Sequence, residues 1–247
     1  MISSTQKKHI IAVMKALPSR SRYLKTELLK DELKLKQDGA VEIYYSPHNE
    51  YINSSAKIVL LGITPGWQQV EIAFRAAVQC LQEQKSYGEA CREAKFAAGM
   101  AGPMRANLMQ MLQEIGIHDY LGITSIQHLF EPGCTLLHTT SLIRFPVFVA
   151  KQNYNGHRPS LTRNPFLFGE VLESFLPEIG RLNRPLIIPL GKSVEEMLRL
   201  LIDRQLIPGQ TVLWGFPHPS GANGHRLQQF YANKAAMERV VDSLMQP

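Results

Sequence analysis

Cysteine is scarce in this sequence, and the few cysteines present form no recognisable pattern. Cys80, Cys91 and Cys134 are odd in number and widely separated. This spacing excludes a disulfide framework and a Cys-x-x-Cys metal motif, so we interpret all three as small buried thiols. The eight histidines include no His-x-x-x-His pair. We therefore expect no metal site and no cofactor.

Long apolar runs are also missing. No apolar stretch approaches the roughly 18 residues of a membrane helix. Residues 1–14 lack the apolar core and the cleavage site of a signal peptide. We expect a cytoplasmic protein with no membrane partner. The 247 residues, of which 45% are hydrophobic, are enough for one large α/β domain with a sizeable core.

Acidic side chains are absent from three windows, residues 51–70, 132–169 and 204–237, although the chain contains 21 Asp and Glu residues. The formal net charge is +6. A basic chain with acid-free segments favours a polyanionic partner.

Periodicity predicts alternating strands and helices. The expected strands are residues 41–45, 58–61, 136–149 (one or two strands), 185–190 and 211–214. The expected helices are residues 4–17, 24–35, 70–92 with a break near 87–88, 104–115, 166–179, 193–202 and 227–244. Residues 96–103 and 151–165 read as loops. The pattern predicts an α/β fold, a three-layer α/β/α arrangement around a central, mainly parallel sheet of four to five strands. We expect residues 1–247 to form a single domain, with residues 1–50 as an N-terminal helical extension.

Three common catalytic and nucleotide-binding motifs do not occur. Gly191-Lys192-Ser193 is similar to the end of a phosphate-binding loop, but that loop needs glycine at the position of Leu186. No Gly-x-Gly-x-x-Gly follows a predicted strand, and no Gly-x-Ser-x-Gly elbow exists. We interpret Gly191 as an ordinary helix start, with Ser193 and Glu196 as a capping box.

Two loops remain as candidates. Gly62-Ile63-Thr64-Pro65-Gly66-Trp67 follows the first buried strand, and His218-Pro219-Ser220-Gly221 follows the last one. Loops at the carboxyl ends of parallel strands are where such sheets bind ligands. Both loops are expected to open on the same edge of the sheet.

In this combination the sequence resembles the uracil-DNA glycosylase superfamily. Its members carry a Gly-x-x-Pro-Gly-like loop early and a His-Pro-Ser loop late. The likeness extends from about residue 58 to residue 244. Gly99-Met100-Ala101-Gly102, Arg163-Asn164-Pro165 and the segment 187–198 match further motifs of the thermophilic-type members.

The resemblance implies excision of uracil or a related deaminated base from DNA, as in base excision repair. The base must be swung out of the stack before it can be cut. His218 would donate a hydrogen bond to the base carbonyl where negative charge grows. Thr64 stands at the position that orients or activates water in many members. Phe96 is the candidate stacking platform for the flipped base. Ser141 stands at the position where an asparagine side chain recognises uracil in many members. The other substrate-binding candidates are Gly62, Ile63, Pro65, Gly66 and Trp67.

The resemblance also implies that the partner is DNA, either double- or single-stranded, bound by a monomer, and it implies contacts to the DNA strand. Ser220 would grip a phosphate, and Gly221, Ala222 and Asn223 occupy the place of the wedge that fills the hole left by the base. Ala222 is small for that task. The phosphate-contact candidates are Arg144, Lys151, Arg158 and Arg226.

The chain departs from the family pattern at three positions. Thr64 replaces the usual Asp or Asn, and a hydroxyl cannot take a proton from water at neutral pH. Ser141 offers fewer hydrogen bonds than an amide, and Gly66 widens the pocket. The resemblance therefore implies a slower enzyme with an altered base preference. The three cysteines cannot hold the iron–sulfur cluster of the thermophilic-type members.

Structural interpretations of the same residues stay open. His218 is alternatively a structural histidine, Thr64 a turn-capping hydroxyl, Phe96 a core residue and Ser141 a strand filler. Trp67 and Trp214 are interpreted as packing residues. Two other functions remain possible: a non-catalytic binder of nucleic acid or nucleobase on the same fold, and a hydrolase of another N-glycoside.

Overall fold

Two short apolar segments form the centre of a parallel sheet. In the computed structural model, which describes residues 2–246, Ile58–Gly62 (β3) pairs in parallel with Leu186–Pro189 (β7), and Leu61 lies opposite Pro189. Leu137–Ser141 (β4) flanks β3, so the strand order is β4-β3-β7. Val212 adds one parallel bridge beside β7. The β-branched and leucine side chains of β3 are buried on both faces, as expected for an inner parallel strand.

The chain divides into two compact units. Unit 1 contains the residues up to Ile52 together with Thr64–Gly99 and Ser141–Phe175. Unit 2 contains Asn53–Ile63, Met100–Thr140 and the residues from Leu176 onward. The parallel sheet belongs mainly to unit 2.

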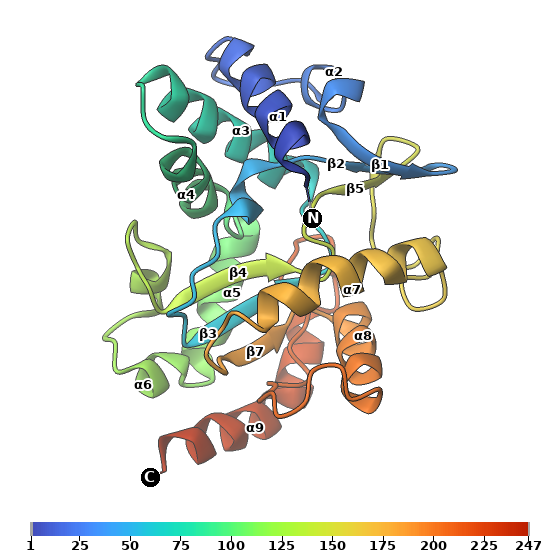
Figure 1. The fold of residues 1–247 in the computed structure, drawn as a ribbon. Coiled ribbons are helices and arrows are strands. Elements are labelled where there is room, and N and C mark those ends of the chain that lie inside the picture. The colour runs from blue at the N-terminus through green and yellow to red at the C-terminus, as the bar shows by residue number, and fades with distance from the viewer. Residues whose placement is uncertain (1, 247) are drawn as a thin grey trace. The chain divides into compact units, whose positions relative to one another are not determined.

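Helices cover the parallel sheet on both faces, which confirms the predicted α/β/α class. On one face, Ile58 and Leu60 pack in a core with Leu112 and Phe230. The helices that supply this core are Pro103–Glu114 (α5), Ile117–Leu121 (α6) and Arg226–Met245 (α9), with the 3-10 turn Ile126–Phe130 (η3) beside them (Figure 1). After β7 the chain continues into Lys192–Asp203 (α8), which contacts β7.

Unit 1 carries a second, antiparallel sheet. Two of its strands lie within the predicted strand segments 41–45 and 136–149, but the sequence pattern did not predict the sheet. Its strands, in the order β1-β2-β5-β6, are Lys34–Asp38, Val41–Tyr44, Val147–Val149 and Gln152–Asn153. The helices of unit 1 are Ser4–Ala16 (α1), Lys25–Leu28 (α2), Trp67–Gln82 (α3), Tyr87–Ala98 (α4) and most of Pro165–Ile179 (α7), with 3-10 turns Asp31–Leu33 (η1) and Pro47–Glu50 (η2). A core built around Met14, Phe74 and Tyr45 joins α1, α3 and α4.

The predicted helix over residues 24–35 is wrong. Only one helical turn forms, and the chain then enters η1 and β1. Leu28 packs in one core and Leu29 in another, so the segment does not bury a single helix face. After β1, Gly39 adopts φ 56° in a tight turn and lets Asp38 pair with Val41. Leu24, expected on the apolar helix face, is 65% exposed.

Three other predicted boundaries need correction. Phe96 lies inside α4, so the loop after it covers only residues 99–102. The predicted 211–214 strand reduces to the single bridge at Val212. The capping box of Ser193 with Glu196 is absent, because α8 begins one residue earlier and its N-cap is Gly191.

Leu60→Ala tests the sheet core. Leu60 is fully buried in the core of unit 2, so we expect the substitution to lower the free energy of unfolding by about 2–5 kcal/mol. Urea denaturation measures the change. The control is Leu206→Ala, since Leu206 is 40% exposed and should cost at most about 0.5 kcal/mol. Equal losses in the two variants would contradict this packing.

Candidate functional site

Three chain segments of unit 2 end at one edge of the parallel sheet. The amide of Leu190 donates to the carbonyl of Leu61 at 2.9 Å, which aligns the ends of β7 and β3. The amide of Gly191 donates to the carbonyl of Phe216 at 3.0 Å. The loop that begins at Gly62 and the loop that contains His218 therefore leave the same edge. Carboxyl ends of parallel strands are the usual ligand-binding edge of such a sheet.

Gly191 allows the His218 loop to pass directly against the end of β7. A Cβ atom at Gly191 would lie 3.0 Å from the Cβ of His218, and Gly191 has φ +93°. Both the contact and the left-handed backbone favour glycine. The sequence pattern gave Gly191 only a helix-start role. Its second role depends on a neighbour 27 positions away in the chain, which no local motif could indicate.

His218 is held as a neutral ring with a defined donor. The backbone amide of Ser220 donates to Nδ1 of His218 at 3.3 Å. Because a backbone N–H can only donate, Nδ1 must be the acceptor and the ring proton sits on Nε2. Burial lowers the pKa of His218 below its usual value, which also favours the neutral ring. The half-buried side chain thus offers an Nε2–H donor.

Three side chains hold the backbone of this loop by donating hydrogen bonds to its carbonyl groups. Asn107 Nδ2 donates to the carbonyl of Pro219 at 2.9 Å, and Asn223 Nδ2 donates to the carbonyl of His218 at 3.2 Å. Arg226, the first residue of α9, donates from its guanidinium to the carbonyl of Ser220 at 3.1 Å. The loop is therefore preorganised around the histidine.

The other predicted DNA contacts of this loop occupy its outer side. Gly221 and Ala222 are exposed. The amide of Ala222 donates to Oγ of Ser220 at 3.2 Å, which uses one acceptor site of that hydroxyl. Asn223 and Arg226 have the scaffold role just described. The structure thus brings His218, Ser220 and their neighbours together in unit 2.

Thr64 belongs to unit 1, where its hydroxyl bridges two backbone groups of one turn. Oγ1 donates to the carbonyl of Phe145 at 2.9 Å and accepts from the amide of Val147 at 2.9 Å. These bonds hold the turn around Pro146 and the start of β5. A hydroxyl has one proton and two lone pairs, so one lone pair remains for a further donor. Sequence reasoning foresaw the turn-capping role only as an alternative.

Gly66 and Trp67 are tied to the β5–β6 hairpin of unit 1. The amide of Trp67, at the start of α3, donates to Oδ1 of Asn153 at 3.0 Å. The indole is half-buried and packs against the cores around Phe74 and Phe148. Trp67 therefore acts as a packing residue in unit 1. The preceding Pro65 is buried, while Gly66 is partly exposed.

Phe96 and Ser141 occupy regular secondary structure. The Phe96 ring on α4 lies 6.3 Å from the ring of Tyr51, and the Arg92 guanidinium lies 5.7 Å from its centroid. Ser141, the last residue of β4, is 7% exposed. Ile63 is partly exposed just after the end of β3.

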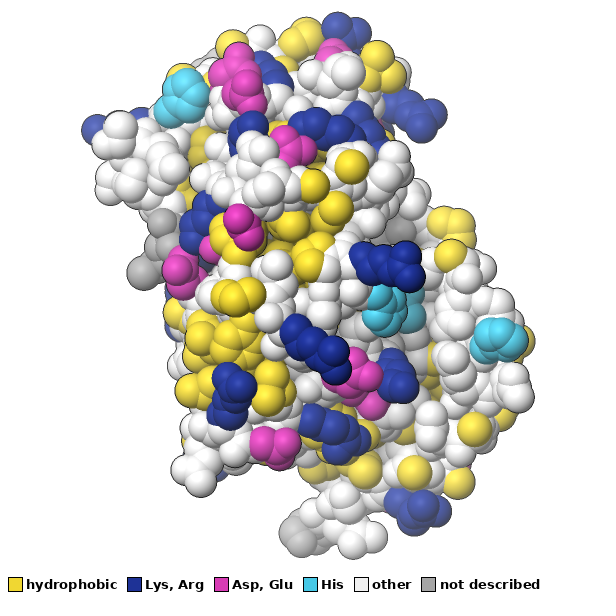
Figure 2. All heavy atoms as spheres, turned by 90° about the vertical axis from the view of Figure 1, so that its right-hand side faces the viewer, with side chains coloured by type: hydrophobic (Ala, Val, Ile, Leu, Met, Phe, Trp, Pro, Cys, Tyr) yellow, Lys and Arg dark blue, Asp and Glu magenta, His cyan; other side chains and the backbone are white. Residues whose placement is uncertain are grey.

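Two of the predicted phosphate contacts in unit 1 are engaged within the protein. Arg144 Nε donates to the carbonyl of Asn49 at 2.7 Å, and Asn49 Nδ2 donates to the carbonyl of Arg144 at 2.7 Å. Lys151 lies 2.8 Å from the carboxylate of Glu42. On the face shown in Figure 2, Lys and Arg side chains are interspersed with Asp and Glu and form no continuous basic area.

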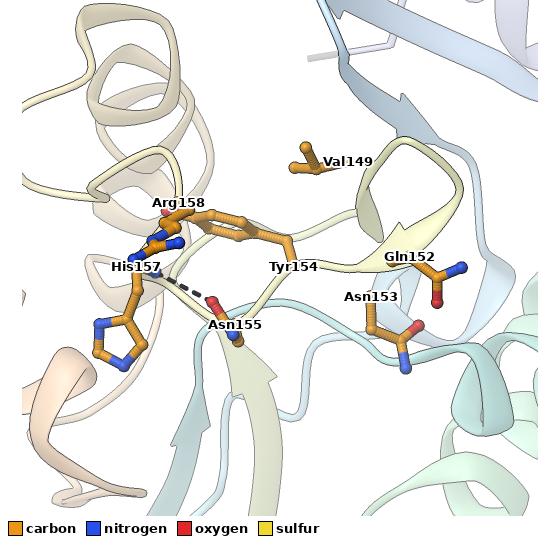
Figure 3. A pocket seen from close by; sticks show the side chains of 7 residues that line it. All are labelled: Val149, Gln152, Asn153, Tyr154, Asn155, His157 and Arg158. Carbon is orange, nitrogen blue, oxygen red and sulfur yellow. Dashed lines mark hydrogen bonds between the residues drawn. The ribbon is translucent and has the colours of Figure 1, made fainter.

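Arg158 lines a pocket of about 510 Å³ in unit 1 that sequence reasoning did not identify. The lining residues come from the end of β5, from β6 and from the following loop (Figure 3). They are Val149, Gln152, Asn153, Tyr154, Asn155, His157 and Arg158. The available signal was the polar, acid-free stretch 151–165, which the sequence analysis recorded only as a loop.

Within residues 2–246, no group of three or more His, Cys, Asp or Glu side chains is placed to hold a metal ion. No helix in this range has the length and apolarity needed to cross a bilayer.

The fold and the loops define an α/β/α protein with a histidine-bearing loop at the carboxyl edge of its parallel sheet. No protein-family profile matches the chain. The uncharacterized protein YoxB of Bacillus subtilis (strain 168) is 42% identical over 224 residues, which are 90% of this chain and 88% of YoxB. The chain therefore belongs to the same family as YoxB.

The chain is also similar to a solved structure. The crystal structure of wild-type Pedobacter heparinus SMUG2 matches with a TM-score of 0.45 and 12% sequence identity, over 96% of this chain and 98% of that chain. A likeness at this TM-score assigns no activity to the chain.

The protonation of His218 can be measured directly. We expect nitrogen NMR of the folded protein at pH 7 to show a neutral ring with its proton on Nε2, and a pKa below 6.5. Between that pKa and about 6.5 the unfolded chain binds more protons, so stability falls as the pH falls through this window. The reference is the same resonance in the urea-unfolded protein. A proton on Nδ1 at pH 7 would contradict the Ser220 contact.

Thr64→Val tests the bridging hydroxyl. Valine keeps the shape of the side chain but leaves the Phe145 carbonyl and the Val147 amide without this partner. We expect the free energy of unfolding to fall by about 1–3 kcal/mol in urea denaturation. Thr64→Ser retains the hydroxyl and is the matched control, with a smaller loss. If valine and serine cost the same, the hydroxyl does not hold this turn.

Proposed function

We propose that this protein is a DNA glycosylase that hydrolyses the N-glycosidic bond of uracil or a related deaminated base. The observation that carries the proposal is the state of His218. A neutral, half-buried imidazole offers Nε2–H from a braced loop at the carboxyl edge of the sheet. The loop that begins at Gly62 leaves the same edge, in the order and spacing that the sequence resemblance requires.

The chemistry needs a donor that is in place before the bond breaks. As the N-glycosidic bond breaks, positive charge develops on the sugar and negative charge on the departing base. A neutral imidazole can donate Nε2–H to the base carbonyl oxygen, where that negative charge accumulates, without reorganisation. Water then adds to the sugar carbon and loses a proton, which completes the hydrolysis without a metal.

Thr64 has a positioning role in this proposal. Its hydroxyl holds the turn around Pro146, and its remaining lone pair can accept a hydrogen bond from the attacking water. It does not act as a general base. Without a general base we expect slow turnover. Because a dissociative transition state needs little help from a base, we expect the activity to be retained.

The remaining site residues follow from the resemblance. Gly62, Ile63, Pro65, Gly66, Trp67, Phe96 and Ser141 are proposed to surround the flipped base. The DNA strand is proposed to contact Arg144, Lys151, Arg158, Ser220, Gly221, Ala222, Asn223 and Arg226. We propose that the protein acts in the cytoplasm as a monomer.

A non-catalytic binder of nucleic acid is the second candidate function. The specific observation in its favour is that Thr64 is already engaged with Phe145 and Val147. Such a binder would show tight, salt-sensitive association with DNA and no product.

The test is an excision assay. Oligonucleotides that contain uracil, hypoxanthine or xanthine are incubated with the protein, and abasic sites are revealed by alkaline cleavage. We expect His218→Ala to lower the single-turnover rate by about 10²–10³, as expected for loss of one preorganised donor. His225→Ala is the matched control, because His225 is exposed further along the same loop and should retain the wild-type rate.

Two outcomes would overturn the proposal. Binding of all these oligonucleotides without abasic sites would favour the non-catalytic binder. Abasic sites formed equally by the His218→Ala variant would remove His218 from the chemistry.

A further inference from the structure

The pocket of unit 1 has a wall built by one continuous segment. Its volume is about 510 Å³, and its lining starts at Val149 and ends at Arg158. Figure 3 shows Asn155, His157 and Arg158 on one side and Gln152 and Asn153 on the other. The opening is therefore framed by polar side chains from the hairpin and from the loop after it.

The two asparagine side chains of this wall line the pocket, and both use their oxygens to bind backbone amides. Oδ1 of Asn153 accepts from the Trp67 amide at 3.0 Å, and Oδ1 of Asn155 accepts from the His157 amide at 3.2 Å. Because backbone amides can only donate, both oxygens are assigned and cannot be exchanged with nitrogen. Among the residues that the structure describes, no hydrogen bond uses Nδ2 of either side chain. An acceptor-rich ligand suits this arrangement.

The charge of the wall also favours an anionic ligand. No Asp or Glu occurs between residues 132 and 169. The nearby Lys151 is paired with Glu42 at 2.8 Å and does not line the pocket, so Arg158 is the cationic side chain of the lining. Arg158 is exposed, and its planar guanidinium can form paired hydrogen bonds to phosphate oxygens.

Beside the polar side chains of Gln152 and His157, the lining also has an apolar part. The Tyr154 hydroxyl donates to the Pro159 carbonyl at 2.6 Å. Tyr154 therefore contributes the apolar surface of its ring to the pocket. Val149 adds an aliphatic surface. Such a surface beside an anion site fits a sugar that is attached to a phosphate.

We infer that this pocket binds one phosphate of a DNA strand together with its sugar. Asn155 Nδ2 and the Arg158 guanidinium hold the phosphate, and Tyr154 with Val149 contacts the sugar. The identity of the strand as DNA rests on the proposed function, whereas the preference for a phosphate rests on the wall itself. Since Asn153 also holds the Trp67 amide, the strand would contact the residues that fix the loop after Thr64.

The probe is a fluorescent single-stranded nonathymidylate, with binding followed by anisotropy. Thymidine monophosphate and thymidine are the competitors, since they differ only in the phosphate. We expect the monophosphate to compete and thymidine not to compete. We also expect the monophosphate to shift the side-chain amide signals of Asn153 and Asn155 in nitrogen NMR spectra.

Asn155→Asp is the decisive variant. Aspartate retains an oxygen for the His157 amide, so the loop keeps its bond, but it replaces the Nδ2 donor with an acceptor of negative charge. We expect oligonucleotide binding to weaken by about tenfold or more, and by a similar factor in Arg158→Ala. Arg163→Ala is the matched control, because Arg163 is exposed in the same acid-free segment but does not line the pocket. It should change binding by no more than about twofold.

The result is separable from the proposed glycosylase activity. The nonathymidylate contains none of the bases that the excision assay tests, so failure of the excision assay would leave the pocket result intact. The inference is overturned if Arg163→Ala weakens binding as much as Arg158→Ala, if Asn155→Asp binds normally, or if thymidine competes as well as its monophosphate.

Discussion

The close approach of Gly191 to His218 is the constraint on which the candidate site depends. A side chain at position 191 would meet the histidine at 3.0 Å, and the backbone there is left-handed. The amide of Gly191 is meanwhile bonded to Phe216. The end of β7 and the His218 loop are thereby held against each other, which places the imidazole at the edge where β3 also ends.

Several polar side chains that the sequence indicated as functional form hydrogen bonds to the backbone in the fold. Thr64 bridges a turn, and Arg226 and Asn223 bond to loop carbonyls. These bonds satisfy backbone groups that would otherwise be costly to bury. Among the residues that the structure describes, no hydrogen bond uses Nε2–H of His218, so this donor remains available to a ligand.

Prediction from sequence succeeded where a signal was local and strong. The apolar runs of β3 and β7 and the period of α5, α7, α8 and α9 were all identified, because burial imposes those patterns directly. The 24–35 helix failed because its leucines serve two different cores, with Leu28 in one and Leu29 in another. The spacing of apolar residues cannot distinguish a helix with one buried face from a segment that packs in two cores. The antiparallel sheet of unit 1 was missed because the pairing of β2 with β5, which joins its two hairpins, connects residues more than 100 positions apart.

The sequence by itself determined the α/β class, the two candidate loops and the acid-free segments, since these depend on composition and short-range spacing. Only the tertiary structure decided which ring nitrogen of His218 carries the proton and where a pocket opens. It also decided which side-chain hydroxyls and amides form hydrogen bonds to the backbone. The physical reason is that each of these depends on a hydrogen bond or contact set by the fold. Asn153 meets Trp67, 86 positions away, and Gly191 meets His218, 27 positions away.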